Sequence, residues 1–342
     1  MKDKAKILLV YTGGTIGMIK DYDTGVLKAF NFDELLQNIP ELKILEHEIN
    51  TLSFDEPIDS SNMNPECWVD IAETINDNFE AYDGFVVLHG SDTMSYTASA
   101  LSFMFENLTK PIIFTGSQLP IGDLRTDAKE NLITSIQIAG LQKNGKSVIS
   151  EVGLYFEYKL YRGNRTTKIN AENFQAFASL NHPPLAESGV YLSVDYSALW
   201  KPNRRQKTKL NKGFNNDVVV LKMFPGIKAS TVDYILSKPG LKGVVLETYG
   251  SGNAPSDDWF LDILEEKISK GLYVVNVTQC IGGSVVMGQY ETSVRLKKIG
   301  VVSGKDISTE AAVAKLMYLL GKYLSPKVFK TIFETSLRGE ML

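Results

Sequence analysis

Near the amino terminus the sequence reads Ile7-Leu8-Leu9-Val10-Tyr11-Thr12-Gly13-Gly14-Thr15-Ile16-Gly17-Met18. A short apolar run followed by paired glycines is typical of a buried strand that enters a tight turn. We therefore expect Thr15 just beyond the carboxyl end of this strand. In open α/β sheets ligands bind at that edge, so the stretch predicts both the class of fold and the place of a site.

A second segment repeats this arrangement. The apolar run Phe85–His89 is followed at once by Gly90-Ser91-Asp92-Thr93-Met94 and then by a segment of helix-compatible composition. If the two strands are neighbours, Thr15, Ser91 and Asp92 share one crevice. Two hydroxyls and a carboxylate beside free backbone N–H groups are suited to attack on a carbonyl or amide.

Simpler interpretations of the first segment remain open. Gly13 and Gly14 could only permit a positive φ angle in a turn, and Thr15 could be a helix N-cap. Nucleotide binding has less support, because the run matches neither the dinucleotide pattern G-x-G-x-x-G nor the phosphate loop G-x-x-x-x-G-K-[ST].

The few histidines narrow the chemistry. His47 lies in a charged stretch, His182 precedes two prolines, and only His89 is near the predicted crevice. Because His89 ends an apolar strand, a hydrogen-bonded core histidine is the favoured interpretation. A Ser-His-Asp triad therefore has little support, and another base is required.

Lys168 is the natural candidate for that base, since burial or neighbouring cations can lower the pKa of a lysine toward neutrality. It ends a basic segment that follows the strand-like run Val152–Phe156. Arg162 and Arg165 would favour its neutral amine if they are close, whereas Asp92 would orient the amine and oppose that shift. A solvated basic loop is the alternative.

The two segments resemble the signature motifs of the bacterial-type L-asparaginases, and the whole chain resembles their type I, cytoplasmic branch. The resemblance runs from about Lys6 to Glu340 as several ordered motifs. Beyond the two segments they are Asp59-Ser60-Ser61-Asn62-Met63, Thr115-Gly116-Ser117-Gln118-Leu119-Pro120, 160–168, Ala176-Phe177-Ala178-Ser179, 249–255, Thr278-Gln279-Cys280 and Leu337-Arg338-Gly339-Glu340.

The resemblance implies a role for four residues. Thr15 is the nucleophile that attacks the side-chain amide and forms an acyl-enzyme, and Ser91, Asp92 and Lys168 form the supporting triad. The family has a second threonine where this chain has Ser91. Serine keeps the oxygen and loses one methyl group, so we expect an effect on rate and not on the type of reaction.

The resemblance also implies how the two ends of an amino-acid substrate are held. Asp92 supplies the anion for the α-amino cation, and the turn Asp59-Ser60-Ser61 holds the α-carboxylate end with its donors. Ser91, next to Asp92, is also expected to contact the substrate. Without the resemblance, this turn would be interpreted as an Asx or Ser turn or a helix cap.

Three other positions of the family pattern bear on the site. The mobile flap corresponds to about 19–29, where the family's tyrosine aligns near Val26 and this chain offers Tyr22, either as a replacement or as an ordinary loop residue. Asn253 corresponds to an asparagine that reaches the active site of a second subunit, which implies a homodimer or a homotetramer. Its alternative is a plain turn residue. Glu247 stands where the regulated enzymes carry an arginine, so an effector site that grips a carboxylate is not expected.

Composition bounds the rest. The chain has 342 residues, of which 44% are hydrophobic and 22% charged, enough for a large core and two domains. We expect an α/β protein with a parallel-sheet domain over 1–195, a linker over 196–215 and a smaller α/β domain over 216–342. Further strand-like runs at 111–114, 218–223, 243–246 and 273–277 alternate with helix-like segments at 131–141, 259–270 and 310–320.

The same numbers exclude several classes of protein. A net charge of -4 gives no basic footprint for nucleic acid. No run has membrane-spanning or signal-peptide length, and the two cysteines, Cys67 and Cys280, are far apart in the sequence, which is typical of free thiols in a reducing cytoplasm.

The sequence thus predicts a cytoplasmic L-asparaginase that forms L-aspartate and ammonia without a metal or an organic cofactor. The alternatives are an amidase for glutamine, an amidotransferase subunit that releases ammonia for use on tRNA, and a non-catalytic amino-acid sensor. The start of the first strand at the amino terminus disfavours the amidotransferase. A sensor would need Asp92 and Ser60 but not Thr15 or Lys168.

Overall fold

The structure is a computed structural model that describes residues 4–20, 27–29, 39–288 and 291–342. Two compact units make up the chain, Met1–Asn211 and Lys212–Leu342. Just before that boundary, β16 (Lys209–Leu210) pairs with β6 (Phe105–Glu106) of the first unit. An independent linker over 196–215 stays a prediction.

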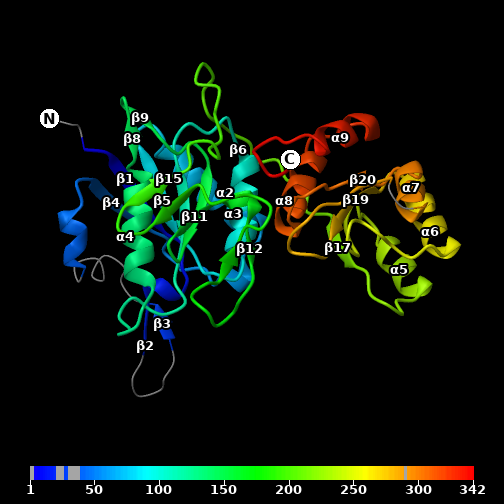
Figure 1. Cartoon of the computed structure of the whole chain (residues 1–342), viewed down its shortest axis with the longest axis horizontal. Coiled ribbons are helices and arrows are strands. Elements are labelled where there is room, and N and C mark those ends of the chain that lie inside the picture. Colours follow the sequence, from blue (N-terminus) through cyan, green and yellow to red (C-terminus); the bar gives the residue numbers. More distant parts are fainter. Residues whose placement is uncertain (1–3, 21–26, 30–38, 289–290) are drawn as a thin grey trace. The chain divides into compact units, whose positions relative to one another are not determined.

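The first unit is built on an eight-stranded sheet with the order β15-β14-β11-β10-β7-β5-β1-β4 (Figure 1). From β4 to β10 all neighbours are parallel, whereas β11, β14 and β15 each pair with their neighbours in antiparallel fashion. The strands are β1 (Lys6–Tyr11), β4 (Glu48–Ser53), β5 (Gly84–Leu88), β7 (Ile112–Thr115), β10 (Val152–Phe156), β11 (Lys159–Arg162), β14 (Ala186–Ser188) and β15 (Leu192–Val194). The predicted α/β class is confirmed, with a sheet that is mixed and mostly parallel.

Both faces of the parallel strands are covered, which is why β1, β5 and β7 are continuous apolar runs. Alternate residues of β1, Ile7, Leu9 and Tyr11, share one core cluster with the inner side of α4 (Ala128–Ala139). Figure 1 shows α4 on one side of the sheet and α2 (Pro65–Asp77) and α3 (Met94–Met104) on the other.

Short elements connect these layers. They are η1 (Thr15–Gly17), β2 (Met18–Lys20), β3 (Leu27–Ala29), η2 (Pro40–Ile44), η3 (Ser60–Asn62), β8 (Gln142–Lys143), β9 (Lys146–Ser147), η4 (Gly163–Arg165), β12 (Thr167–Lys168) and β13 (Phe177–Ala178). The strands β2 and β3 form a hairpin directly after η1.

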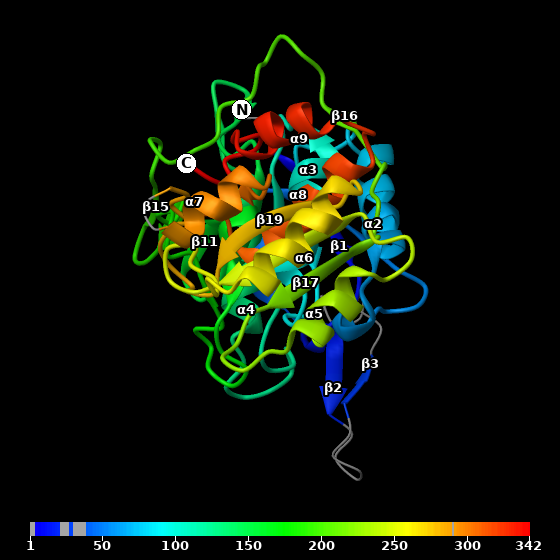
Figure 2. The same cartoon turned by 90° about the vertical axis from the view of Figure 1, so that its right-hand side faces the viewer.

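The second unit contains a four-stranded parallel sheet with the order β17-β18-β19-β20. Figure 2 shows α5 and α6 on one face of this sheet, and their apolar residues share a core with β17, β18 and β19. The elements are β17 (Val218–Lys222), α5 (Ala229–Leu236), β18 (Gly243–Thr248), α6 (Asp258–Ser269), β19 (Tyr273–Thr278), α7 (Glu291–Lys298), β20 (Val302–Ser303), α8 (Thr309–Leu320) and α9 (Pro326–Phe333).

A buried ion pair holds the carboxyl-terminal segment of this unit against α8. Lys315 of α8 is fully buried and donates to the carbonyl oxygens of Phe333 and Thr335 and to the carboxylate of Glu340. Burial lowers the pKa of Lys315, and the Glu340 carboxylate opposes that shift. The motif at 337–340 therefore serves packing within the second unit.

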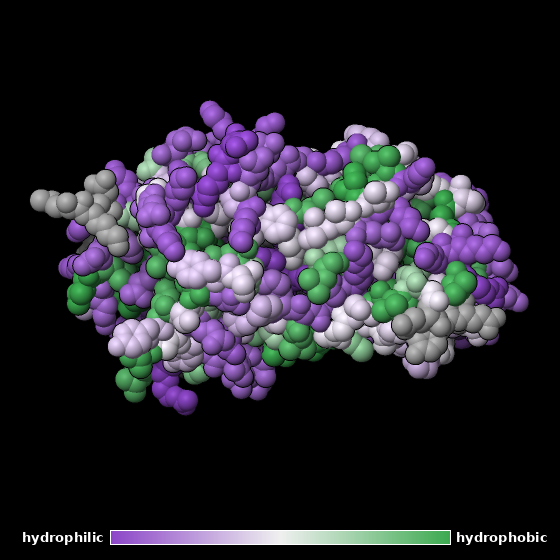
Figure 3. Space-filling view, turned by 45° about the horizontal axis from the view of Figure 1, so that its top comes forward, coloured by the Kyte–Doolittle hydropathy of each residue, from purple (hydrophilic) through white to green (hydrophobic). Residues whose placement is uncertain are grey.

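The surface is mixed. On the face drawn in Figure 3, hydrophilic residues dominate and hydrophobic ones are scattered among them, as is usual for globular proteins. None of the helices in the described ranges has the length and apolar character needed to cross a membrane.

Candidate active site

The order of the strands reverses at β1. The next strand of this sheet, β4, lies on one side of β1, and the strand after it, β5, lies on the other side. This is a topological switch point, where ligands bind in open α/β sheets. Tyr11 and Leu88 are partners at the ends of the two strands. A Cβ added to Gly14 would lie 2.6 Å from the backbone nitrogen of Gly90. The residues that follow these two glycines, Thr15 and Ser91, therefore begin side by side, as the sequence predicts.

The turn around Ser60 forms a third wall of this crevice. The backbone N–H of Ile58 donates to the Thr12 carbonyl at 2.7 Å, and the Thr93 hydroxyl donates to the Ser60 carbonyl at 2.7 Å. Ser60 is buried, and a Cβ on Gly90 would collide with its Oγ. The turn is thereby fixed against the loops that follow β1 and β5.

Asp59 and Ser61 lie at the exposed side of the same turn. The Asp59 side chain caps η3 by accepting the Ser61 N–H at 2.9 Å. That bond lowers the pKa of the Asp59 carboxyl. The carboxylate thus holds the turn in shape, which is the capping role that these residues predict when taken alone.

Lys168 joins the predicted triad. Its Nζ donates to Ser91 Oγ at 2.8 Å and to Asp92 Oδ1 at 2.7 Å. The Lys168 side chain is 18% exposed and that of Asp92 is 66% exposed, so Lys168 is mostly buried and Asp92 faces solvent. The structure thus brings Lys168 into contact with Ser91 and Asp92, which lie 77 and 76 residues earlier in the sequence.

The path of the chain to Lys168 depends on α3. The segment η4 packs on this helix, and a Cβ on Gly163 would lie 3.0 Å from the Cβ of Ala98. Thr166 then donates its hydroxyl to Ser95 Oγ at 3.0 Å. Because α3 starts just after Asp92, these contacts bring β12 and Lys168 back to the carboxyl edge of the sheet.

Arg162 does not take the place that the sequence suggested for it. It pairs with Gly153 at the start of β10, at the opposite edge of the sheet. Its Nε lies 2.5 Å from Glu151 Oε2, and its Nη2 donates to the Ala198 carbonyl at 2.7 Å. The Glu151 carboxylate balances its charge there, so the geometry gives it no role in favouring a neutral Lys168.

Gln118 is a contact of the triad that the sequence did not single out, although it lies within a quoted motif. Its Nε2 donates to the carbonyls of Ala171 and Asn173 at 3.1 and 3.0 Å, which fixes its Oε1 toward Ser91. The Ser91 hydroxyl donates to this oxygen at 3.3 Å. Only the position of residues 171–173 in space reveals this contact, so no local pattern could have predicted it.

Asp127 holds the backbone of the Gln118 loop. Its carboxylate accepts the N–H groups of Gln118 and Leu119 and the side-chain amide of Asn131 at 3.0 to 3.3 Å. Burial raises the pKa of Asp127, and these hydrogen bonds oppose the shift. The carboxylate thereby ties the loop after β7 to the start of α4.

His89 is the core histidine that the sequence favoured. Its ring nitrogens lie 2.7 Å from the Gly90 carbonyl and 3.0 Å from the Thr97 hydroxyl. Because a carbonyl only accepts, Nδ1 carries the proton and Nε2 accepts from Thr97. Burial lowers the pKa of His89 to about 4. The imidazole is therefore neutral, and both of its nitrogens form hydrogen bonds that support the loop. Neither nitrogen is left to accept a proton from a substrate or from Thr15.

The remaining predicted positions are placed as follows. Tyr22 and Val26 lie outside the described residues. Asn253 belongs to the second unit, where its backbone bridges to Tyr249 and its buried Oδ1 has no hydrogen-bond partner among the described residues. Glu247 accepts the Thr309 hydroxyl at 2.6 Å and lies 3.7 Å from Lys222 Nζ, so its charge is balanced within the second unit.

Two other observations concern cofactors and thiols. Within the described ranges, no three His, Cys, Asp or Glu side chains form a group that could hold a metal ion. Cys67 and Cys280 are both free cysteines.

Comparison with known proteins identifies the class of protein that this fold and crevice define. Residues 6–200 match the family model described as asparaginase, N-terminal, and residues 217–333 match the glutaminase/asparaginase C-terminal domain. The chain therefore belongs to the asparaginase family.

Individual relatives support this membership over the full length. The chain is 42% identical to L-asparaginase 1 of Escherichia coli strain K12, covering 99% of this chain and 98% of the relative. The crystal structure of L-asparaginase I from Vibrio cholerae superposes with a TM-score of 0.90 at 41% identity and covers 99% of this chain and 100% of its own. The thermostable L-asparaginase from Thermococcus kodakarensis superposes with a TM-score of 0.88 at 31% identity and covers 98% of this chain and 99% of its own.

Proposed function

We propose that this protein hydrolyses the side-chain amide of L-asparagine to L-aspartate and ammonia through an acyl-enzyme on Thr15. One observation carries the proposal: Lys168 Nζ bridges Ser91 Oγ and Asp92 Oδ1 at the strand ends where Thr15 stands. A hydroxyl, an amine and a carboxylate in contact are the parts that an activated threonine nucleophile needs. Membership of the asparaginase family and the names of the full-length relatives support the same substrate.

The contacts suggest an order for the proton transfers. At rest, Lys168 donates to Ser91, and Ser91 donates to Gln118 Oε1. The relay requires Lys168 to enter this step as a neutral amine. When Thr15 attacks the amide carbon, its proton passes to Ser91 Oγ, and the proton of Ser91 passes to Lys168 Nζ, which becomes an ammonium. The same groups return a proton to the leaving ammonia, and water then releases L-aspartate by the reverse path.

The ends of the substrate have complementary groups nearby. The exposed carboxylate of Asp92 can pair with Lys168 and also receive the α-ammonium of asparagine. The turn of Asp59, Ser60 and Ser61 faces the same crevice and supplies hydroxyl and N–H donors for the α-carboxylate. In this proposal Asp59 acts by capping the turn, and Ser60 by its position against Gly90.

Assembly and location belong to the same proposal. We expect a homodimer or homotetramer in which Asn253 of one subunit reaches the crevice of another, because the chain belongs to the asparaginase family, whose pattern places such an asparagine at this position. A similar structure from Campylobacter jejuni is named "Probable Cytoplasmic L-asparaginase", and the two free cysteines suit a reducing compartment. We expect this chain in the cytoplasm as well.

Glutamine is the competing substrate. It differs from asparagine by one methylene, and a pocket discriminates such a difference by about 1 to 3 kcal/mol. Release of ammonia by the purified full-length chain, measured with asparagine and with glutamine, tests the proposal. We expect a higher kcat/KM for asparagine with measurable glutamine turnover. An equal or higher value for glutamine would identify a glutamine amidase, and binding of asparagine without turnover would identify the sensor.

A further inference from the structure

A pocket of about 550 Å³ opens on the first unit at the edge of the sheet opposite the candidate active site. Ser150 in its wall precedes β10, so the pocket lies at the amino end of this parallel strand, whereas Thr15 and Ser91 follow the carboxyl ends of theirs. The other walls come from Val148 and from the segment 196–205. No step of the proposed amide hydrolysis uses this pocket.

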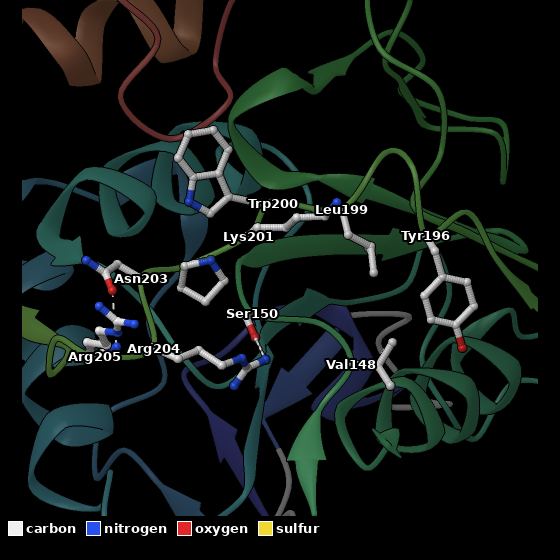
Figure 4. Close-up of a pocket in the computed structure, with 10 residues that line it drawn as sticks. Val148, Ser150, Tyr196, Leu199, Trp200, Lys201, Asn203, Arg204 and Arg205 are labelled. Carbon is white, nitrogen blue, oxygen red and sulfur yellow. Dashed lines mark hydrogen bonds between the residues drawn. The ribbon is translucent and has the colours of Figure 1, made fainter. Parts of the chain in front are cut away.

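One side of the pocket is cationic. Figure 4 shows Arg204 and Arg205 beside Asn203, with the Arg204 guanidinium close to Ser150. Lys201 also lines the pocket. Within the described part of the chain, none of these three cations forms an ion pair, and residues 201–212 contain six basic and no acidic residues. With a net charge of -4 on the whole chain, this is a local concentration of positive charge.

The other side of the pocket is apolar. Figure 4 shows Leu199, Tyr196 and Val148 facing it across from the arginines. Leu199 and Val148 are partly buried against the core of the first unit, whereas Tyr196 is 56% exposed. Lys143 Nζ lies 5.3 Å from the centre of the Tyr196 ring. An exposed aromatic ring held beside aliphatic side chains can receive a planar apolar group.

The walls are held in place without a ligand. Arg204 Nη2 donates to the Ser147 carbonyl at 3.1 Å and to Ser150 Oγ at 3.2 Å. Asn107 exchanges hydrogen bonds of 2.8 and 2.9 Å with the backbone of Asn203 and donates to the Gln206 carbonyl at 2.8 Å. The cationic loop is thereby fixed to the body of the unit, which reduces the entropy lost when a ligand binds.

We propose that this pocket binds a nucleoside phosphate, with the phosphates on Arg204, Arg205 and Lys201 and the base against Tyr196 and Leu199. Two guanidinium groups and an ammonium provide charge-assisted donors that match phosphate oxygens. The volume lies within the range of about 300 to 1,000 Å³ that small-molecule sites occupy. A free amino acid would leave most of it empty, and a simple anion would leave the apolar side unused.

Isothermal titration calorimetry of the full-length protein with ADP tests this proposal, with adenosine and pyrophosphate as partial ligands. We expect ADP to bind at least about tenfold more tightly than either, because only ADP engages both sides of the pocket. Arg204→Gln and Tyr196→Ala should each weaken ADP binding by about tenfold or more. The matched control is Lys207→Gln, which removes an exposed cation of the same loop that does not line the pocket.

The outcomes separate the alternatives. Absence of ADP binding at millimolar concentration would overturn the proposal, and so would pyrophosphate or adenosine binding as tightly as ADP. Equal weakening by Lys207→Gln and Arg204→Gln would show diffuse attraction of anions by the loop and would also overturn it. If a single-stranded oligonucleotide bound more tightly than ADP, the pocket would be part of a nucleic-acid site, and the proposal of a nucleoside phosphate would be wrong. Circular dichroism melts of each variant verify that the fold is intact, and no readout depends on amide hydrolysis.

Discussion

Ser91 is the residue at which this chain departs from the family pattern, and its contacts explain why the departure is tolerable. The hydroxyl oxygen accepts from Lys168 at 2.8 Å and donates to Gln118 at 3.3 Å. These two contacts fix the oxygen without help from the methyl group of a threonine. The position of the oxygen, and not the identity of the side chain, is what proton transfer requires.

Ser91→Ala should therefore lower kcat by about a hundredfold or more, because it removes a proton-transfer group while leaving the substrate contacts of Asp92 and of the Ser60 turn in place. KM should change much less. The matched variant is Ser91→Thr, which restores the family's residue and should keep most of the activity. Steady-state ammonia release gives both constants, and a Ser91→Ala enzyme with nearly full kcat would remove Ser91 from the proposed relay.

His89 is one reason why the folded chain should lose stability as the pH falls. Burial lowers its pKa from 6.5 to about 4, so the unfolded chain binds a proton between these pH values that the folded chain does not. A group that binds protons more strongly when unfolded destabilises the fold as the pH falls. Its contribution is complete above pH 6.5 and is lost progressively as the pH drops to about 4.

The expected loss at His89 is on the order of 3 kcal/mol across that window, since each pKa unit corresponds to about 1.4 kcal/mol. Urea denaturation at pH 7 and near pH 4 measures the loss of the free energy of unfolding. The His89→Gln variant should start less stable but lose less on acidification. An identical loss in both proteins would contradict a buried neutral imidazole.

Among the structural elements, the loops after β1 and β5 matter most to the site because of how closely they approach. Gly14 has φ of 93°, and a Cβ there would meet the Gly90 backbone at 2.6 Å. Backbone atoms cannot yield as a flexible side chain can. The contact brings Thr15 toward Ser91 and leaves no room for a larger residue at Gly14, while Ser60 leaves none at Gly90.

Gly14→Ala should consequently lower both stability and kcat/KM, the latter by at least about tenfold, because small displacements of reacting groups cost about a hundredfold in rate. Gly145→Ala is the matched control: Gly145 also has a positive φ, of 68°, but a Cβ there meets nothing within 4 Å. It should cost only the backbone strain of about 1 kcal/mol and leave the rate unchanged. Thermal melts measure the stability of both variants, and steady-state kinetics measure their kcat/KM. A Gly14→Ala enzyme with the wild-type kcat/KM would show that the close approach of the two loops is dispensable.

Elements that are continuous apolar runs could be predicted from the sequence, and others could not. The strand predicted over 152–156 is confirmed at both ends, because its five residues are all buried. In contrast, β4 was not predicted, since its residues alternate between exposed and partly buried at the edge of the sheet. The strand β11 was missed for a different reason: three of its four residues are buried inside the sheet, but its sequence Lys-Leu-Tyr-Arg contains no apolar run. The antiparallel part of the sheet and the position of Arg162 were missed with it.

Some residues of the candidate site could likewise be predicted from the sequence, and others could not. Glycines after two apolar runs predicted that Thr15, Ser91 and Asp92 lie at one edge of the sheet, because strand ends are a local signal. The basic segment before Lys168 made this lysine the candidate base, and the resemblance to a known family added its place in the triad. The packing of η4 on α3 explains its approach. Gln118 could not be predicted, because its partners on 171–173 are neighbours only in the folded unit.

In the molecule as a whole, the two units have separate cores and separate sheets. The predicted triad lies wholly in the first unit, whereas Asn253 belongs to the second. If Asn253 completes the site of a partner subunit, then each site in a dimer combines Thr15 of one chain with Asn253 of the other.

Co-expression of Thr15→Ala with Asn253→Ala should therefore restore activity that neither variant has alone. In a mixed dimer, one site contains both native residues and the other contains neither. With random pairing, about half of the dimers are mixed, so we expect about a quarter of the wild-type specific activity. Assays on the unfractionated mixture measure this value, whereas tagged and purified mixed dimers should show about half of the wild-type activity. No recovery in the purified mixed dimers would place Asn253 outside the partner's site.

Whether Thr15 is the nucleophile is decided by the kcat of Thr15→Ala with L-asparagine. Loss of a nucleophile typically costs a thousandfold or more, so we expect a kcat below about a thousandth of the wild-type value, with asparagine still bound. Thr15→Ser, which keeps the hydroxyl, should remain measurably active. A Thr15→Ala enzyme that keeps more than about a tenth of the wild-type kcat would contradict the proposed mechanism, because residual binding and electrostatic effects alone cannot sustain that rate.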